Sequence, residues 1–198
     1  MDDVRMALVN PQVRQFEAVG QDRERTLVDL ARAMDPDAWD ELYAQHYAAI
    51  RRYAHFRLGD AALAEDIAAE VFLEALRGIG NYRYRGIAFR AWLYRIAHNL
   101  TANHRKKMSA RRRHESAGLE ADDQVVVDDF APAVQRERDL KAAVATLTDE
   151  QQQVVILRFF EGLTLAETAE VMARKSGAIK SLQHRALQRL RVMLGEDE

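Results

Sequence analysis

The sequence predicts an all-α protein of two small helical domains joined by a flexible linker, the second being a helix-turn-helix domain. Glycine and proline number only nine and three in 198 residues, whereas alanine, leucine, arginine and glutamate, which favour helices, are abundant. No stretch alternates apolar and polar residues between turn signals, as a β-hairpin would. An acidic segment near the middle separates two basic tracts, which favours two domains over one.

The chain divides at this acidic segment. Residues 115–130 hold six acidic side chains and no basic one, so the segment cannot bury enough apolar surface to become ordered on its own. The expected division is an N-terminal extension over 1–34, to which no pattern assigns a role, a first domain over 35–107, a linker over 108–133 and a second domain over 134–198.

Three helices are expected in the first domain. Asp35 followed by Pro36 combines a capping acceptor with the residue best suited to the first helical position. Apolar residues then recur at steps of three and four until Gly59, which predicts the end of this helix. Asp60 opens a second amphipathic helix, and a third begins near Phe89.

The second domain has the pattern of a helix-turn-helix. Thr148 and Thr164 are each followed three residues later by glutamine or glutamate, which is the sequence form of a capping box. Gly162 separates the two helices that they open. A short helix over 165–172, a tight turn and a longer basic helix over 178–194 complete the motif.

The basic helix has one apolar face and one polar face. Its buried face is expected to consist of Ile179, Leu182, Ala186 and Leu190. This leaves Lys180, Ser181, Gln183, His184 and Arg185 to meet a major groove and its phosphates. The plainer alternative is a three-helix bundle with a solvated basic face, but the absence of any acidic residue from 171 to 195 favours DNA binding.

A second acid-free tract, over 75–114, mixes cations with aromatic rings. Cations follow a phosphate backbone and rings stack on unpaired bases, so this composition favours single-stranded nucleic acid. The alternative is that the rings belong to the core, because aromatic residues at helical spacing usually do. Core packing is the stronger expectation for Trp92, and base stacking for Tyr82 and Tyr84.

Several classes of function lack their sequence signals. The chain has no cysteine, its six histidines show no zinc or catalytic spacing, and a carboxylate stripe at Asp66, Glu70 and Glu74 lacks a further converging ligand. No phosphate loop or nucleophile elbow is found. No apolar stretch has the length of a membrane span. We therefore expect a cytoplasmic protein that is no enzyme, holds no metal or other cofactor and does not insert into a membrane.

Three segments resemble bacterial sigma factors. Residues 64–72 are similar to part of their second conserved region, residues 89–99 resemble their promoter-melting helix, and residues 162–186 resemble their fourth region. The segments come in the family's order, and the gap between them is too short for the domain that housekeeping members carry there. The chain is accordingly identified as resembling the extracytoplasmic-function group, which makes promoter-specific transcription initiation its expected function.

The resemblance implies partners for each surface. RNA polymerase core would be contacted through the clamp helices of its large subunit and through its flap, and an anti-sigma factor would inhibit the chain. The implied core-binding residues are Asp66, Glu70 and Phe72. Those facing the −10 element, as duplex or single strand, are Asn81, Tyr82, Arg83, Tyr84, Arg85, Arg95, Asn99, Asn103, Arg105 and Lys106. Those facing the −35 element are Arg174, Lys175, Lys180, Ser181, His184, Arg185 and Arg189.

Two positions depart from the family's pattern. Ala173 stands where the family usually has glycine in the turn, and Lys175 stands where it usually has a hydroxyl cap.

A stand-alone helix-turn-helix regulator remains the alternative function. It would need a dimer to bind palindromic half-sites, and no dimer helix is evident in the sequence.

Overall fold

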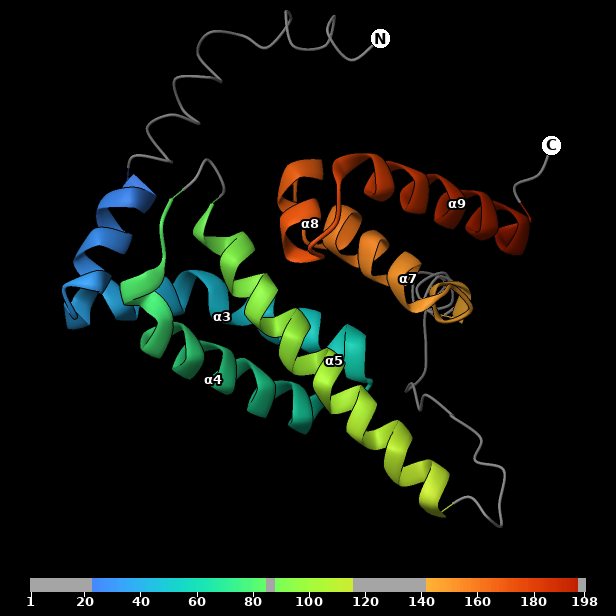
Figure 1. Ribbon diagram of the computed structural model, residues 1–198, viewed down its shortest axis with the longest axis horizontal. Helices are drawn as coiled ribbons and strands as arrows, with labels where there is room; N and C mark the ends of the chain where they lie inside the picture. The colour runs from blue at the N-terminus through green and yellow to red at the C-terminus, as the bar shows by residue number, and fades with distance from the viewer. Residues whose placement is uncertain (1–22, 85–87, 116–141, 196–198) are drawn as a thin grey trace, which may run out of the picture.

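The computed structural model describes residues 23–84, 88–115 and 142–195, with side chains described as far as Arg111 in the second of these ranges. All regular structure in these ranges is helical, which confirms the predicted fold class. The labelled elements are α3 (Pro36–Leu58), α4 (Ala61–Gly78), the 3-10 turn η1 (Ile79–Asn81), α5 (Phe89–Glu115), α7 (Asp149–Val155), the π-helical turn η2 (Ile156–Phe160), α8 (Leu165–Val171) and α9 (Ser176–Leu194) (Figure 1). Residues 23–32 and 142–145 are also helical.

The predicted helix boundaries of the first domain are confirmed by their caps. The Asp35 carboxylate accepts a hydrogen bond from the Ala38 N–H at 2.9 Å, and Pro36 is the first residue of α3. Gly59 ends the helix in the left-handed conformation, with φ of 73°. Asp60 caps α4 through the Leu63 N–H at 3.1 Å.

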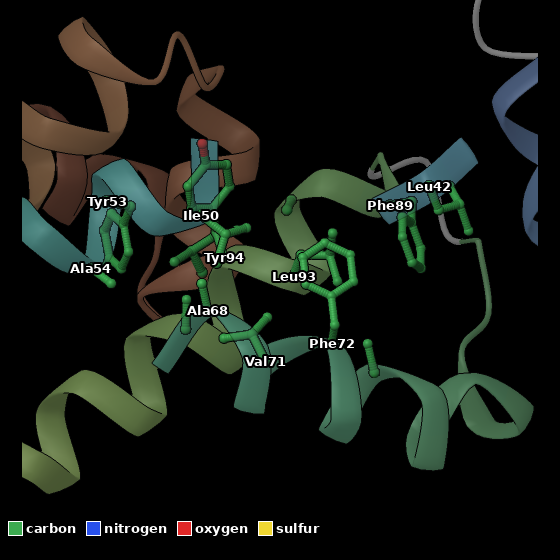
Figure 2. Close-up of a cluster of buried hydrophobic side chains, with 14 of the residues drawn as sticks. Leu42, Ile50, Tyr53, Ala54, Ala68, Val71, Phe72, Phe89, Leu93 and Tyr94 are labelled. Carbon is green, nitrogen blue, oxygen red and sulfur yellow. The ribbon is translucent and has the colours of Figure 1, made fainter. Parts of the chain in front are cut away.

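The core of the first domain lies between α3, α4 and α5 (Figure 2). Among its fully buried side chains are Leu42 and Ile50 of α3, Val71 of α4, and Phe89 and Leu93 of α5. The helix over 23–32 packs on the same core through Leu27, Val28 and Ala31. The segment before Asp35 is therefore anchored to this domain from residue 23 onward.

The helix-turn-helix of the second domain has the predicted caps and apolar face. Both capping boxes are present, Thr148 with Gln151 and Thr164 with Glu167. The α9 residues that face inward are Ile179, Leu182, Ala186 and Leu190. The sequence did not predict η2, a single π-helical turn that lies between α7 and Gly162.

One predicted boundary is wrong. The helix α5 continues to Glu115, past Lys107, so residues 108–115, which were placed in the flexible linker, are helical. The composition of this stretch is compatible with helix, because it contains alanine and three arginines, which are good helix formers. The rest of the expected linker, and the start of the second domain up to residue 141, lie outside the described residues.

The two domains touch. The helix α8 lies beside α5 (Figure 1), and Ile156, Leu157, Leu163 and Val171 of the second domain join the core of the first. Phe160 of η2 packs against Phe56 of α3 with ring centroids 5.0 Å apart. We call this placement of α8 against α5 the closed arrangement.

Candidate nucleic-acid interface

One side of α5 carries the polar residues that the sequence assigned to the −10 element. Arg95, Asn99 and Asn103 follow one another at steps of four, which places them on one side of the helix, and all three are exposed. Lys106 is exposed as well, whereas Arg105 is half-buried. A single DNA strand can reach this side of α5 only where the second domain does not cover the helix.

The closed arrangement engages two of these cations. Arg95 pairs with Glu170 of α8, with Nη1 and Oε1 2.7 Å apart, and both side chains are about half exposed. Arg105 pairs with Asp149 at the start of α7. Carboxylates of the second domain thus neutralise two of the arginines that the sequence assigned to the −10 element.

The loop after α4 is partly built into the core. The ring of Tyr82 lies edge-on to Phe89, with centroids 5.5 Å apart, and is tilted against Trp92 at 5.1 Å. Burial raises the pKa of Tyr82 to about 12, with the charge of Glu24 adding to the effect. The core interpretation therefore holds for Trp92, and it holds in part for Tyr82, for which we had favoured stacking on DNA.

The remaining loop residues are nearer to solvent. Asn81 and Arg83 are exposed and Tyr84 is half-buried. Arg83 donates from Nη1 to the carbonyl oxygens of Gly80 and Tyr82, at 2.8 and 2.9 Å, which holds its side chain over its own loop. Arg85 lies outside the described residues.

The expected core-binding residues of α4 divide between surface and core. Asp66 and Glu70 are exposed, as a partner-binding surface requires. Phe72 is only 7% exposed and packs against Tyr43, with ring centroids 4.8 Å apart. Phe72 therefore supports the helix from inside, and its expected contact with polymerase stays a prediction.

The −35 candidates lie on the outer side of α9 and in the turn before it. The exposed residues are Arg174, Lys175, Lys180, Ser181, His184, Arg185 and Arg189. Ser181 donates to the Gly177 carbonyl at 3.1 Å, and Arg185 Nε donates to the Ser181 carbonyl at 3.3 Å. Arg174 is ion-paired with Glu150 of α7. The surface that the sequence predicted for a major groove is thus assembled on one helix.

The turn of the helix-turn-helix has the two departures that the sequence indicated. Ala173 adopts the left-handed conformation with φ of 51°, where glycine would be unstrained. Lys175 is the N-cap residue of α9 but makes no side-chain capping hydrogen bond. The turn therefore keeps the helix-turn-helix geometry despite side chains that do not favour it.

The sequence did not predict a cluster of charged contacts between the domains. Glu161, whose side chain is 1% exposed, accepts hydrogen bonds from Arg52 Nε at 3.0 Å, Arg52 Nη2 at 2.5 Å and the Tyr94 hydroxyl at 2.7 Å. Arg90 donates twice to Glu167. Burial by itself would raise the pKa of Glu167, but hydrogen bonds from Arg90 and Thr164 hold it below its ordinary value.

A buried arginine lies at the other end of the domain contact. The side chain of Arg57 is 0% exposed, and its Nη2 donates to Asp149 at 2.7 Å. Its Nε and Nη1 have no hydrogen-bond partner. Arg57 follows Ile50, Tyr53 and Ala54 on the apolar face of α3, so an arginine in that apolar repeat was the signal that sequence reasoning could have used.

The described residues contain neither a group of three or more potential metal ligands nor a helix long and apolar enough to cross a membrane.

Two family comparisons match the two domains. Residues 42–123 match Sigma-70 region 2, and residues 143–192 match Sigma-70, region 4. Among curated proteins, the ECF RNA polymerase sigma factor BldN of Streptomyces coelicolor is 42% identical over 179 residues, 88% of this chain and 67% of that protein. The ECF RNA polymerase sigma factor SigM of Mycobacterium tuberculosis is 31% identical over 163 residues, 82% of this chain and 80% of that protein.

Solved structures share the fold. CnrH in complex with the cytosolic domain of CnrY matches with a TM-score of 0.67 and 21% identity, over 88% of this chain and 99% of that one. The sigma factor RpoE in complex with the anti-sigma factor NepR from Bartonella quintana matches with a TM-score of 0.65 and 24% identity, over 80% of this chain and 98% of that one.

Proposed function

We propose a division of labour between the two domains of this chain, which belongs to the extracytoplasmic-function group of RNA polymerase sigma factors. Its two domains are the second and fourth sigma-70 regions, and its function is that of a sigma factor in transcription initiation, without enzymatic activity of its own. The proposal concerns which surface binds the polymerase, which binds duplex DNA and which binds a separated strand.

The second domain binds the −35 element as duplex. The observation that carries this assignment is the exposed, acid-free outer side of α9, on a helix whose inner side is fixed by four buried apolar residues. Lys180 and Arg185 are the residues we assign to base edges and phosphates together, and Arg189 to phosphate. A helix presented in this way fits a major groove.

The first domain holds the −10 element and keeps its strands apart. The arginine and asparagines on one side of α5 bind the strand, and the neighbouring loop receives an extruded base. Stacking and base capture offset the cost of unpairing, so no chemical step is required.

Core polymerase binds to the exposed acidic stripe of α4. Asp66 and Glu70 are exposed on one side of that helix, and reversing their charge leaves the core untouched. The partner is the clamp-helix region of the large polymerase subunit, and the second domain contacts the flap. The site of action is the cytoplasm, where core polymerase transcribes.

An anti-sigma factor is the proposed inhibitory partner. The solved complexes that share this fold include one with the cytosolic domain of CnrY and one with the anti-sigma factor NepR. A partner of this kind would bind the two domains together and keep them from promoter DNA.

Transcription in vitro tests the proposal. Core polymerase is incubated with genomic fragments and the purified chain, and the 5′ ends of the transcripts are mapped. We expect a small set of start sites that share −35 and −10 sequences.

The Asp66→Lys/Glu70→Lys variant should lose core binding while retaining the wild-type melting temperature, because an exposed stripe contributes little to stability.

Variants in α9 test the −35 assignment. Lys180→Ala and Arg185→Ala should weaken promoter binding, by about 1–3 kcal/mol at one position for a base contact and uniformly for a phosphate contact. Arg191→Ala, at an exposed position near the end of the same helix, is the matched control. Palindrome binding by a dimer, with no start sites specified by the chain, would favour the stand-alone regulator.

A further inference from the structure

A cavity of about 290 Å³ lies between the −10 loop and the helix over 23–32. One wall comes from the loop, through Tyr82, Arg83 and Tyr84. The opposite wall comes from the helix, through Glu24, Arg25 and Val28, with Phe89 at the base of α5 between them. Two segments far apart in the sequence thus enclose a space next to the residues assigned to an extruded base.

Glu24 lies next to the start of α5. Burial raises its pKa, while the charge of Arg90 and the backbone N–H groups of Arg90 and Phe89 act in the opposite direction and favour its ionised form. The first N–H groups of a helix lack partners within the helix, and a carboxylate there both satisfies them and complements the helix dipole. The wall formed by the helix over 23–32 is therefore held in a defined position relative to the loop and to α5.

Arg25 holds the tyrosine of the opposite wall. Its guanidinium carbon lies 4.0 Å from the centroid of the Tyr84 ring, a stacked cation–π contact. Arg25 is exposed and Tyr84 half-buried, so neither side chain is committed to the core. A tyrosine ring offers a stacking surface to a nucleobase, while the planar guanidinium offers donors to base edges and phosphates.

Two further arginines line the cavity. Arg32 is paired with Asp29 at 3.3 Å within the same helix, and Arg83 donates to two carbonyls of its own loop. Arg25 is the guanidinium that stacks on a ring of the opposite wall.

We propose that this cavity is the receptor for one unpaired base of single-stranded promoter DNA, with Arg25 as a binding residue contributed by the helix that precedes Asp35. The inference rests on the proposed function and deepens it. It gives the segment over 23–32 a role in strand capture, and it predicts that base capture requires Arg25 and Tyr84 together.

A second cavity on the far side of the loop is the competing location. It has a volume of about 340 Å³ and is lined by Asn81, Trp92 and Arg95, among others. In the closed arrangement Glu170 of α8 also lines it and pairs with Arg95. Asn81 lines this cavity only, and Arg25 lines the first only, so the two locations can be distinguished by substitution.

The experiment uses holoenzyme made of core polymerase and the full chain, on a promoter identified by the transcript mapping above. Each nucleotide of the non-template strand in the −10 region is replaced in turn by an abasic site. The lifetime of the open complex is then measured after a heparin challenge. For the wild-type chain we expect one position at which the abasic site shortens the lifetime about tenfold, the effect of one lost stacking contact.

Arg25→Ala should shorten the lifetime on intact DNA by a similar factor, and the abasic site should then add little. Tyr84→Leu should behave like Arg25→Ala, whereas Arg25→Lys and Tyr84→Phe should lose less, because each keeps a charge or a ring. Arg23→Ala is the matched control: Arg23 lies in the same helix, pairs with Glu41 at 3.0 Å and does not line the cavity. Equal melting temperatures would show that the folds are intact.

Three outcomes would overturn the proposal. The first is an Arg25→Ala lifetime equal to that of Arg23→Ala. The second is that the abasic site shortens the lifetime of the open complex by the same factor in Arg25→Ala as in the wild-type chain. The two changes would then act independently, and Arg25 would not bind that base. The third is coupling of the abasic site to Asn81→Ala instead, which would place the base in the other cavity. Absence of specific initiation by the wild-type chain is scored separately and would reject the proposed function itself.

Discussion

The guanidinium of Arg90 in α5 donates two hydrogen bonds to the carboxylate of Glu167 in α8, at 2.9 and 3.0 Å. Glu167 also completes the capping box of α8, since its carboxylate accepts the Thr164 N–H at 2.7 Å. One carboxylate therefore both caps the first helix of the helix-turn-helix and attaches that helix to the first domain.

Neutralising Glu161 should open the closed arrangement. In Glu161→Gln, the Arg52 guanidinium and the Tyr94 hydroxyl lose a charged acceptor, and hydrogen bonds to charged groups contribute about 1.5–3 kcal/mol. Because the chain has no cysteine, Ala69→Cys and Gln188→Cys allow energy transfer between dyes on α4 and α9 to report the distance. We expect lower transfer efficiency for the variant.

The matched control for that variant is Glu170→Gln. Its ion pair with Arg95 is about half exposed on both sides, and exposed pairs contribute at most about 1 kcal/mol. It should therefore change transfer efficiency much less. If both variants gave the wild-type efficiency, charge pairing would not hold the domains together.

Arg57 should be replaceable by an apolar residue, whereas Asp149 should not be replaceable alone. Asp149→Ala leaves a buried guanidinium without its carboxylate, which we expect to cost about 2–3 kcal/mol of unfolding free energy, less than for a fully buried pair because Asp149 is half exposed. In an Arg57→Met background the same substitution should cost less than about 1 kcal/mol. Urea unfolding of the wild-type chain, the two single variants and the double variant measures this coupling. If the two losses of unfolding free energy simply added in the double variant, the coupling would be absent.

The local features of the fold could be predicted because their signals are local. Asp35, Asp60, Thr148 and Thr164 cap helices within a few residues of themselves, so capping patterns located their N-termini. The inner face of α9 followed from its helical period. Ala173 could be recognised as a conflict because the left-handed position of the turn follows from the motif.

The contact between the domains could not be predicted in this way. Glu161 and Glu167 each meet partners more than 60 positions away, and nothing in their local pattern distinguishes them from solvated residues. The burial of Phe72 was not predicted, for a related reason. Helical spacing does not distinguish a ring that faces a partner from one that faces the core. Phe72 is buried because Tyr43 of α3, which stacks on Tyr47, packs against it.

Stability should fall between about pH 6.5 and pH 4 because of His98. Burial, followed by the charge of Arg57, lowers the pKa of His98 to about 4. Its Nδ1 lies 2.5 Å from the Gln153 amide nitrogen and so accepts in the neutral form. As pH falls below the unfolded pKa of about 6.5, the unfolded chain gains a proton that the folded chain does not, and stability drops until about pH 4.

This pH dependence can be separated from that of Glu167. Glu167 has a lowered pKa, so its contribution is lost only below the ordinary pKa of a glutamate, about 4.3. His46, with a pKa of about 4 for similar reasons, should respond like His98. The His98→Asn variant keeps an acceptor and does not titrate, so its melting temperature should vary about half as much between pH 5 and 7. An unchanged slope would exclude His98 as the group responsible.

Ala173→Gly should stabilise the second domain. A non-glycine residue in the left-handed region costs about 1 kcal/mol, and glycine removes that cost at the price of a more flexible unfolded chain. We expect a net gain of about 0.5 kcal/mol in urea unfolding. Promoter binding should not change, because Ala173 has no side chain that could reach DNA. A loss of stability would mean that the turn relaxes around alanine without strain.

Lys175→Ser should increase stability while weakening DNA binding. A serine at the N-cap of α9 can accept a backbone hydrogen bond that lysine does not provide, which stabilises a helix by about 1 kcal/mol. The same substitution removes a cation expected to face the −35 element. We expect this lysine to contact a phosphate, so the slope of log affinity against log salt should fall by about 1. Lys175→Arg keeps the charge and should retain the wild-type slope without the gain in stability. If Lys175→Ser left the slope unchanged, this lysine would not contact phosphate, and the missing cap would have no explanation in DNA binding.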